Sequence, residues 1–409
     1  MRLAIIGGGI AGLVAAHLLH RDHAITLFEA NDYPGGHTHT LPVRVGNATW
    51  EVDTGFIVYN EQNYPRFTQL LARLGVATQA SCMSFSVRAD RADFEYNGTT
   101  LNQLFGQRRN LLKPSFYRMV RDILRFNREA PSAILDGAAR ATLVEYVSAA
   151  HYSRQFVDHY LVPMASALWS QPRARVLDMP LAFLVQFLEQ HGMLALHDRP
   201  AWRVIRGGAR RYVEALIRPY RDRIRLRHAV RAVTRHPTHV DVDGETFDEV
   251  MFACHADQAL GILTDPTPAE RGILAAFPYQ PNNVVVHTDA SLLPRRRALW
   301  AAWNYHLADD PAAPVAVTYD MNILQTLDAP VTFCVTLNRT ADVAPERVLR
   351  RLTYHHPIIT TASVRAQGRH GEISGVNRTH YCGAYWGNGF HEDGVTSAIA
   401  ACKPFGVTR

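Results

Sequence analysis

The sequence has little of what a disulfide framework, a zinc site or a membrane span requires. Its five cysteines are scattered through 409 residues and form no CxxC pair, so a disulfide-rich or zinc-binding protein is a poor fit. The apolar stretch at residues 4–19 contains four glycines and is followed by charged residues, whereas a spanning helix needs about 20 apolar residues. We expect a globular protein of the reducing cytoplasm.

Lysine is nearly absent as well. Lys113 and Lys403 are the lysines among 43 basic side chains, so residues 114–402 contain none. The net charge of +6 is modest, and no stripe of basic and stacking residues accompanies a nucleic-acid motif, so nucleic acid is not an expected partner. A hydrophobic content of 47% provides for a large core.

A phosphate-binding pattern stands near the N-terminus. Gly7-x-Gly9-x-x-Gly12 follows an apolar segment expected to be a strand, residues 3–6, and precedes an expected helix, residues 13–19. In such a pattern the first glycine permits the tight turn, the second admits a pyrophosphate, and the third lets helix and strand pack closely. The phosphates then lie at the positive end of the helix. The stretch therefore predicts a dinucleotide site rather than a secretion signal or anchor.

An acidic residue completes the pattern. A second expected strand, residues 24–28, ends at Glu29, which lies 22 residues after Gly7. A carboxylate at about that distance hydrogen-bonds the ribose hydroxyls of the nucleotide. It also disfavours a 2′-phosphate, which argues against NADP at this site.

A second glycine pair, Gly35-Gly36, follows this acid. The string GGGIAGLVAAHLL…ITLFEANDYPGGHTHT resembles the N-terminal signature of the FAD-dependent amine oxidase superfamily, which includes flavin amine oxidases, protoporphyrinogen oxidases and phytoene-type desaturases. The superfamily usually carries an arginine after the double glycine, where this chain has His37. A role that needs a permanent charge at that position is therefore in doubt.

Further stretches resemble the same superfamily in the expected order. Residues 50–56 resemble its strand and turn beneath the flavin, and residues 206–209 the loop that re-enters the FAD domain. Residues 225–233 are similar to the strand that holds the adenine, and residues 247–256 to its next strand and loop. Residues 381–394, with the string GFHEDG, resemble its C-terminal return to the cofactor.

The resemblance implies FAD as the cofactor, held by residues from all of these stretches. The implied FAD-binding residues are Gly7, Gly9, Ile10, Ala11, Gly12, Glu29, Ala30, Gly35, Gly36, His37, Thr38, Thr54, Gly55, Phe56, Val230, Ala253, Gly383, Ala384, His391, Glu392, Asp393 and Gly394.

The resemblance also implies an α/β fold, α+β overall, in which a Rossmann-like FAD-binding domain of the amine oxidase type carries an inserted, discontinuous substrate domain. The FAD-binding domain would comprise residues 1–75, 200–265 and 370–409. The substrate domain would comprise residues 76–199, which read as a helical cap, and residues 266–369, which read as a mainly antiparallel sheet.

The substrate is inferred from a narrower resemblance and from the missing lysine. Amine oxidases of the superfamily commonly place a lysine near flavin N5, and residues 114–402 hold none. Residues 52–67 and 287–305 resemble a bacterial branch encoded beside cyclopropane-fatty-acid-synthase-like methyltransferases and linked to furan fatty acids. That resemblance implies dehydrogenation of a hydrophobic substrate, a (methyl-branched) phospholipid acyl chain, by hydride transfer to flavin N5. His287 and Tyr305 are the candidate catalytic residues, since a base must take the accompanying proton.

Other functions remain open at this point. A flavin amine oxidase acting on a C–N bond is the first alternative, and a non-catalytic flavoprotein partner of a lipid methyltransferase is the second. A pure NAD dehydrogenase is a weaker alternative. Residues 108–126 alternate basic and apolar side chains, which is most typical of a surface helix with a solvated arginine face and an apolar face toward the core, and also fits a helix on a membrane surface. Peripheral contact with the inner membrane face is therefore one hypothesis.

Overall fold

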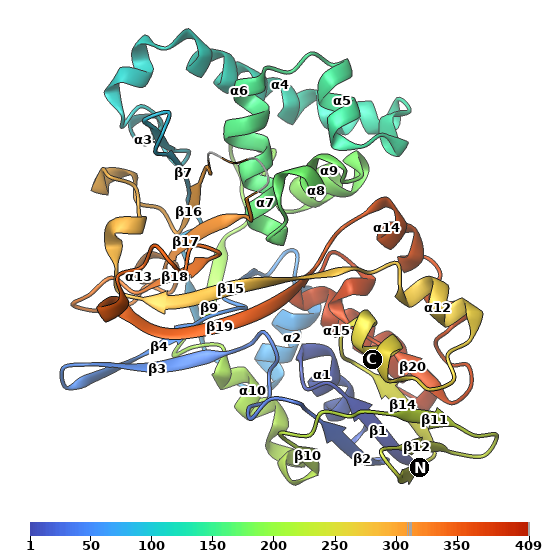
Figure 1. Cartoon of the computed structure of the whole chain (residues 1–409). Helices are drawn as coiled ribbons and strands as arrows, with labels where there is room; N and C mark the ends of the chain where they lie inside the picture. Colours follow the sequence, from blue (N-terminus) through green and yellow to red (C-terminus); the bar gives the residue numbers. More distant parts are fainter. Residues whose placement is uncertain (309, 311–312, 408–409) are drawn as a thin grey trace.

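The computed structural model describes residues 1–308, 310 and 313–407. Figure 1 shows three levels: an α/β part that holds both termini, a long twisted sheet above it, and a group of helices at the top. Segments from both ends and the middle of the chain meet in the α/β part.

A five-stranded sheet forms the centre of the α/β part, in the order β10-β2-β1-β14-β20, and every neighbouring pair is parallel. Its strands are short and apolar, as expected of a sheet covered on both faces. They are β1 (Arg2–Ile6), β2 (Ala24–Phe28), β10 (Ile224–Arg225), β14 (Glu249–Phe252) and β20 (Thr379–Tyr381).

Alternate side chains of β1 enter two separate cores. Leu3 and Ile5 pack among the helices of one face, whereas Ala4 and Ile6 pack against the other layer, as the two-residue period of a strand requires. The first layer consists of α1 (Ile10–Leu19), α2 (Pro65–Arg73), α10 (Arg210–Ile217) and α15 (His391–Cys402). The second consists of β11 (Val233–Arg235), β12 (Val240–Val242), β13 (Glu245–Phe247), α11 (Ala256–Ile262), α12 (Pro268–Leu274) and α14 (Thr361–Gln367).

The long sheet has seven strands in the order β19-β15-β18-β17-β16-β7-β8, and it is antiparallel except for the pair of β7 and β16. Strand β15 pairs with β19 along nearly its whole length. The strands are β7 (Phe85–Ala89), β8 (Phe94–Asn97), β15 (Tyr279–His287), β16 (Trp303–His306), β17 (Ala316–Asp320), β18 (Cys334–Leu337) and β19 (Val348–Pro357).

The helical cap covers one end of this sheet and shares its largest core. Its elements are α3 (Leu101–Leu104), the 3₁₀ helix η1 (Arg108–Leu112), α4 (Pro114–Leu135), α5 (Leu143–Ala149), α6 (Arg154–Phe156), the π-helical turn η3 (Val157–Leu161), α7 (Val162–Trp169), α8 (Arg173–Leu177) and α9 (Leu181–Gln190). Across the described residues, none of the helices has the length and apolarity to cross a membrane.

Smaller elements connect the two parts. A hairpin of β3 (Thr40–Val45) and β4 (Ala48–Asp53) and a sheet of β5 (Val58–Asn60), β9 (Trp202–Ile205) and β6 (Thr78–Ala80) lie between them. The remaining short helices are η2 (Ala138–Arg140), η4 (Arg218–Arg223), η5 (Ala290–Leu292), η6 (Arg297–Leu299), α13 (Met321–Leu324), η7 (Pro345–Arg347), η8 (His370–Glu372), η9 (Ala384–Trp386) and η10 (Lys403–Phe405).

Two local features differ from the sequence-based expectation. The strand expected at residues 225–233 is extended at its two ends, in β10 and β11, and forms a loop between them. Arg227 adopts a positive φ of 56° there, and its amide donates to Asn31 O. In addition, α12 and α14 pack against the parallel sheet through Ile273 and Ala366. Both helices lie in segments that the sequence assigns to the substrate domain.

Asp53, at the end of β4, joins the two parts. It is fully buried and accepts hydrogen bonds from Ala209 N at 2.9 Å, Thr40 Oγ1 at 2.5 Å and Gln325 Nε2 at 2.8 Å.

We expect Asp53→Ala to lower the free energy of unfolding by about 3 kcal/mol or more, because three buried donors lose their acceptor. Urea unfolding beside the exposed control Asp328→Ala tests this. Equal stability of the two variants would contradict it.

Candidate active site

A cavity of about 820 Å³ opens at the carboxyl ends of the parallel strands. That position is where open parallel sheets bind ligands, and the volume lies within the usual range for ligand pockets. The loop after β1 and the start of α1 form its floor, and residues of β19 line its opposite side. Strand β19 lies between the parallel sheet and the cap, which brings the substrate-domain sheet to the cavity (Figure 1).

The three glycines of the N-terminal pattern have different steric roles. A Cβ on Gly7 would lie 2.8 Å from the backbone of Ala253, and one on Gly12 would lie 1.9 Å from Gly7 O. A Cβ on Gly9 would meet no atom within 4 Å, and Gly9 lines the cavity. No side chain caps the N-terminus of α1, so its amides are free for an anionic group. This cradle fits a pyrophosphate.

Glu29 lies beside this cradle, at the end of β2. Its buried carboxylate accepts hydrogen bonds from Gly8 N at 2.7 Å and from Asn31 N and Nδ2 at 2.8 and 2.9 Å. These bonds fix the carboxylate in the cavity wall, where its free lone pairs can accept from ribose hydroxyls. The predicted ribose contact therefore has the geometry that it requires.

The second glycine pair packs directly on the first loop. Gly35 N donates to Gly8 O at 2.8 Å. Gly36 has a φ of +58°, and a Cβ there would lie 3.0 Å from Gly9 Cα. A side chain at Gly36 would push the two loops apart, and a Cβ at Gly35 would lie 2.4 Å from Thr38 O within its own loop, so both positions require glycine.

His391 begins α15 and forms part of the cavity wall. Its ring stacks on Phe56 at 3.4 Å between centroids, and Nε2 lies 3.0 Å from both Thr38 Oγ1 and Tyr212 Oη. Burial lowers the pKa of His391 well below its usual range, so the ring is neutral. Thr38 and Phe56 thus orient a wall residue.

Neutral rings form the end of the cavity near β19. The ring of His37 lies 4.8 Å from Tyr354, 5.2 Å from His356 and 6.0 Å from His255. Burial lowers the pKa of His37 and of His356 to about 3 and that of His255 to about 4. His355, which also lines the cavity, is the exposed member of the group.

Most of the residues predicted to bind FAD line this cavity. They are Gly7, Gly9, Ile10, Ala11, Glu29, Ala30, Gly35, Gly36, His37, Val230, Ala253, Gly383, Ala384 and His391.

The remaining predicted residues lie behind the wall or beside it. Gly12, Gly55 and Gly394 lie at contacts where a Cβ would meet Gly7 O, His37 O or Ile10 Cγ2. Thr54 Oγ1 lies 2.6 Å from Tyr354 Oη. Glu392 accepts from the first amides of α2, and Asp393 from Phe390 N.

The two residues predicted as catalytic do not lie in this cavity. His287 is fully buried in β15, with Nε2 2.7 Å from Thr336 Oγ1 and with Nδ1 accepting from Asp289 N at 3.1 Å. Tyr305 lines a separate pocket of about 350 Å³ between β16 and the cap. The antiparallel sheet thus turns both side chains away from the glycine cradle.

The burial of His287 has a consequence for stability. Burial lowers its pKa from 6.5 to about 4. As the pH falls through this window, the unfolded chain binds a proton that the folded chain does not, so the free energy of unfolding falls by about 1.4 kcal/mol per pH unit. We expect His287→Gln to remove this component and to retain FAD. Urea unfolding from neutral to acidic pH, with the exposed control His197→Gln, measures the difference. A slope equal to that of the wild type would contradict this.

Several wall residues carry no local sequence motif for this site, because long-range strand pairing brings them to the cavity. Tyr354 and His355 arrive on β19 and Tyr279 on β15, far from any glycine motif. A usable signal was the run Tyr354-His355-His356, three ring side chains in succession near the end of an arginine-rich strand.

Comparisons with known proteins identify the family of this chain. Residues 10–296, more than two thirds of the chain, match the family model described as flavin containing amine oxidoreductase. None of the curated proteins matches the sequence.

Solved structures share the fold over the whole chain. A cyclohexylamine oxidase from Brevibacterium oxydans IH-35A is 14% identical, with 99% of each chain covered and a TM-score of 0.71. A fatty acid isomerase from P. acnes that produces CLA is 15% identical, with 99% of this chain and 98% of that one covered and a TM-score of 0.66. A UDP-galactopyranose mutase is 14% identical, with 100% and 94% covered and a TM-score of 0.69.

The glycine cradle, the ribose carboxylate and the cavity between the two parts fit FAD, and the matched residues 10–296 include Glu29 and the middle segments of the cavity lining. The chain belongs to the flavin-containing amine oxidoreductase family and is an FAD-dependent oxidoreductase.

Proposed function

We propose that this enzyme dehydrogenates a neutral, hydrophobic substrate, a (methyl-branched) phospholipid acyl chain. FAD, when bound, supplies the hydride acceptor. The observation that carries the proposal is the wall of uncharged rings at the β19 end of the cavity. Burial lowers the pKa values of the lining residues His37 and His255, and of His356, whose ring lies 5.2 Å from that of His37. Such a wall favours an uncharged substrate, because a buried charge needs a partner.

Charged groups that could bind an ammonium substrate are scarce there. Glu29 is the carboxylate among the described residues that line the cavity, and it is engaged by Gly8 and Asn31 at the ribose end. Residues 114–402 contain no lysine, so this chain offers no counterpart to the lysine that the amine oxidase resemblance implies.

An aromatic path leads from the cavity toward the cap. Phe390 lines the main cavity and also an adjacent pocket of about 430 Å³ beside α9. The lining of that pocket includes Glu392 and Asp393, whose carboxylates accept hydrogen bonds from backbone amides. Its ring stacks on Phe187 at 4.9 Å, and Phe187 contacts Trp169 at 4.7 Å. The apolar cavity inside the cap holds about 10 Å³, too little for an acyl chain, so the path past Phe390 is the proposed route.

His355 is the group proposed to take the proton. Dehydrogenation removes a proton together with the hydride, and a positioned imidazole is the commonest base. His355 lines the cavity beside the buried histidines and is itself exposed.

We expect His355→Gln to slow flavin reduction about a hundredfold with FAD retained. Stopped-flow reduction measures this, with His197→Gln as the exposed control. Equal rates in the two variants would remove His355 from the reaction.

The second candidate is oxidation of a C–N bond. It is favoured by the family itself and by the cyclohexylamine oxidase among the structures of the same fold. Hydrogen peroxide release with a panel of amines, and no reduction of the flavin by lipid, would support this candidate and contradict the proposed one. Anaerobic bleaching by phospholipid and not by amines would do the opposite.

A further inference from the structure

We propose that the outer end of the helical cap is a docking surface for an anionic phospholipid membrane. The surface, called the leucine–arginine tip below, consists of Leu101, Leu111, Leu112 and Tyr117 with Arg108, Arg118 and Arg121. Leu101 is 77% exposed and Leu112 is 85% exposed. Leu111 and Tyr117 are 44% and 48% exposed. Exposed large apolar side chains close together mark an interaction site.

Hydrogen bonds hold the three segments of the tip together. Arg108 Nη2, in η1, donates to Asn102 Oδ1, in α3, at 2.7 Å. Tyr117 Oη, in α4, donates to Leu111 O at 3.0 Å, and its ring lies 5.8 Å from that of Phe105. The exposed leucines therefore belong to one structured surface. The cap that carries them lies at the top of the molecule in Figure 1.

The segment that carries the leucine–arginine tip has basic side chains and no acidic ones. Residues 96–121 contain four arginines and one lysine and no acidic residue. Arg108 bonds to uncharged groups, the Asn102 side chain and Phe105 O. Arg118 and Arg121 are exposed, and the structure gives Arg118 no partner among the described residues. Positive charge is thus interspersed with exposed leucine.

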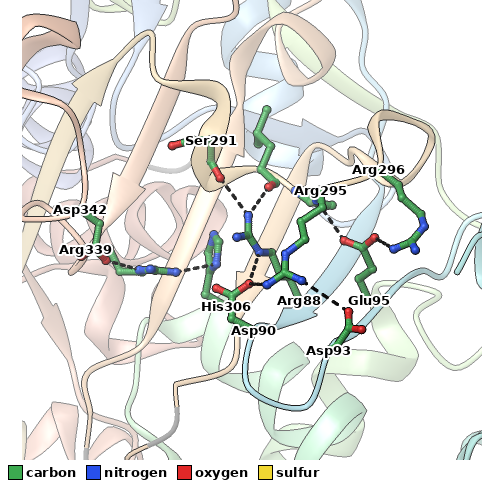
Figure 2. A network of polar contacts seen from close by, with 12 residues as sticks. Arg88, Asp90, Asp93, Glu95, Ser291, Arg295, Arg296, His306, Arg339 and Asp342 are labelled. Carbon is green, nitrogen blue, oxygen red and sulfur yellow. Dashed lines mark hydrogen bonds and ion pairs between the residues drawn. The ribbon is translucent and has the colours of Figure 1, made fainter.

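A second basic segment lies beside the tip. Gln103 Nε2 donates to Ala298 O at 3.3 Å, and Leu299 packs against Gly106. This contact brings residues 295–297, all arginine, next to α3. Figure 2 shows the ion pairs that Arg295 and Arg296 make with the nearby acids, Asp90, Asp93 and Glu95. Because these acids are already paired, Arg118 is left to a partner outside the chain, whereas Arg121 lies 3.8 Å from the buried carboxylate of Asp122.

A membrane surface matches both properties of the tip. An anionic bilayer presents phosphate groups above an apolar layer, so it can take arginine side chains at the phosphates and leucine side chains just below them. The buried face of α4, with Phe116, Met119 and Phe126, holds the helix to the cap, so the tip can insert without unfolding the core. This inference rests on the proposed function and deepens it, because docking on a membrane would bring the enzyme to its phospholipid acyl chains.

Vesicle co-sedimentation of the FAD-loaded full chain tests the inference. We expect binding to vesicles of phosphatidylcholine with about a third of phosphatidylglycerol, and weaker binding to phosphatidylcholine alone or at high salt. The double variant Leu101→Ser/Leu112→Ser should bind about tenfold or more weakly. The matched control Leu135→Ser changes a leucine that is 87% exposed at the end of α4 away from the tip, and it should bind like the wild type.

A charge variant keeps the test decisive if the leucine variant folds poorly. Arg118→Ala should weaken binding about fivefold, whereas Arg128→Ala, exposed on the same helix, should not. Retained flavin absorbance reports folding. No binding by the wild type, or equal binding by tip and control variants, would overturn the proposal. Loss of a dimer in the tip variants without any vesicle binding would overturn it in favour of a protein interface. Vesicle binding without bleaching by lipid would reject the proposed substrate and keep the docking surface.

Discussion

Gly9→Val should lower the affinity for FAD about a thousandfold, since several charge-assisted hydrogen bonds to the pyrophosphate are lost together. The apoprotein should fold normally, because a Cβ at Gly9 meets no atom within 4 Å and the backbone has φ −73° and ψ −178°, which valine tolerates. The added side chain points into the cavity instead. Fluorescence titration of the apoprotein with FAD, together with its thermal midpoint, measures both quantities.

The control for this prediction is Gly272→Val in α12, where a Cβ also meets nothing. It should bind FAD like the wild type. If valine at Gly9 disturbed the loop itself, the smaller change Gly9→Ala would still weaken binding with an unchanged midpoint. An affinity within about threefold of the wild type for Gly9→Val would show that the pyrophosphate does not lie on this loop.

Glu29→Ala should weaken FAD binding about a hundredfold, because the charged acceptor for the ribose hydroxyls is removed. The loss should be smaller, about tenfold, for Glu29→Gln, which keeps one acceptor oxygen. Calorimetric titration separates the two variants. Glu346→Ala, at an exposed position, is the control. Equal affinities of Glu29→Ala and Glu346→Ala would place the ribose elsewhere.

The nucleotide-binding end of the site could be predicted from the sequence. Its signals are local: the strand expected at residues 24–28 is β2 as observed, and the glycines that the turn requires lie within six residues of one another. Two of these constraints are local: Gly7 has a positive φ of 109° at the turn, and a Cβ on Gly12 would lie 1.9 Å from Gly7 O within the same βαβ unit. Such short-range constraints are visible as spacing in a single sequence.

The substrate end could not be predicted in the same way. The motifs around His287 and Tyr305 suggest them as catalytic candidates, but the face on which β15 and β16 place these side chains depends on the register of each strand with β18 and β17. His355 comes to the cavity only because β19 pairs with β15 across the long sheet. Periodicity in the sequence does not reveal such pairing, so the wall of neutral rings is seen only in the structure.

Anaerobic flavin bleaching tests the central claim most directly. The purified, FAD-loaded enzyme is mixed without oxygen with extracted phospholipids, and the acyl chains are analysed by mass. The account predicts loss of the oxidised flavin absorbance and acyl chains that are lighter by two hydrogens. Flavin that stays oxidised with phospholipid and is bleached by amines would contradict it.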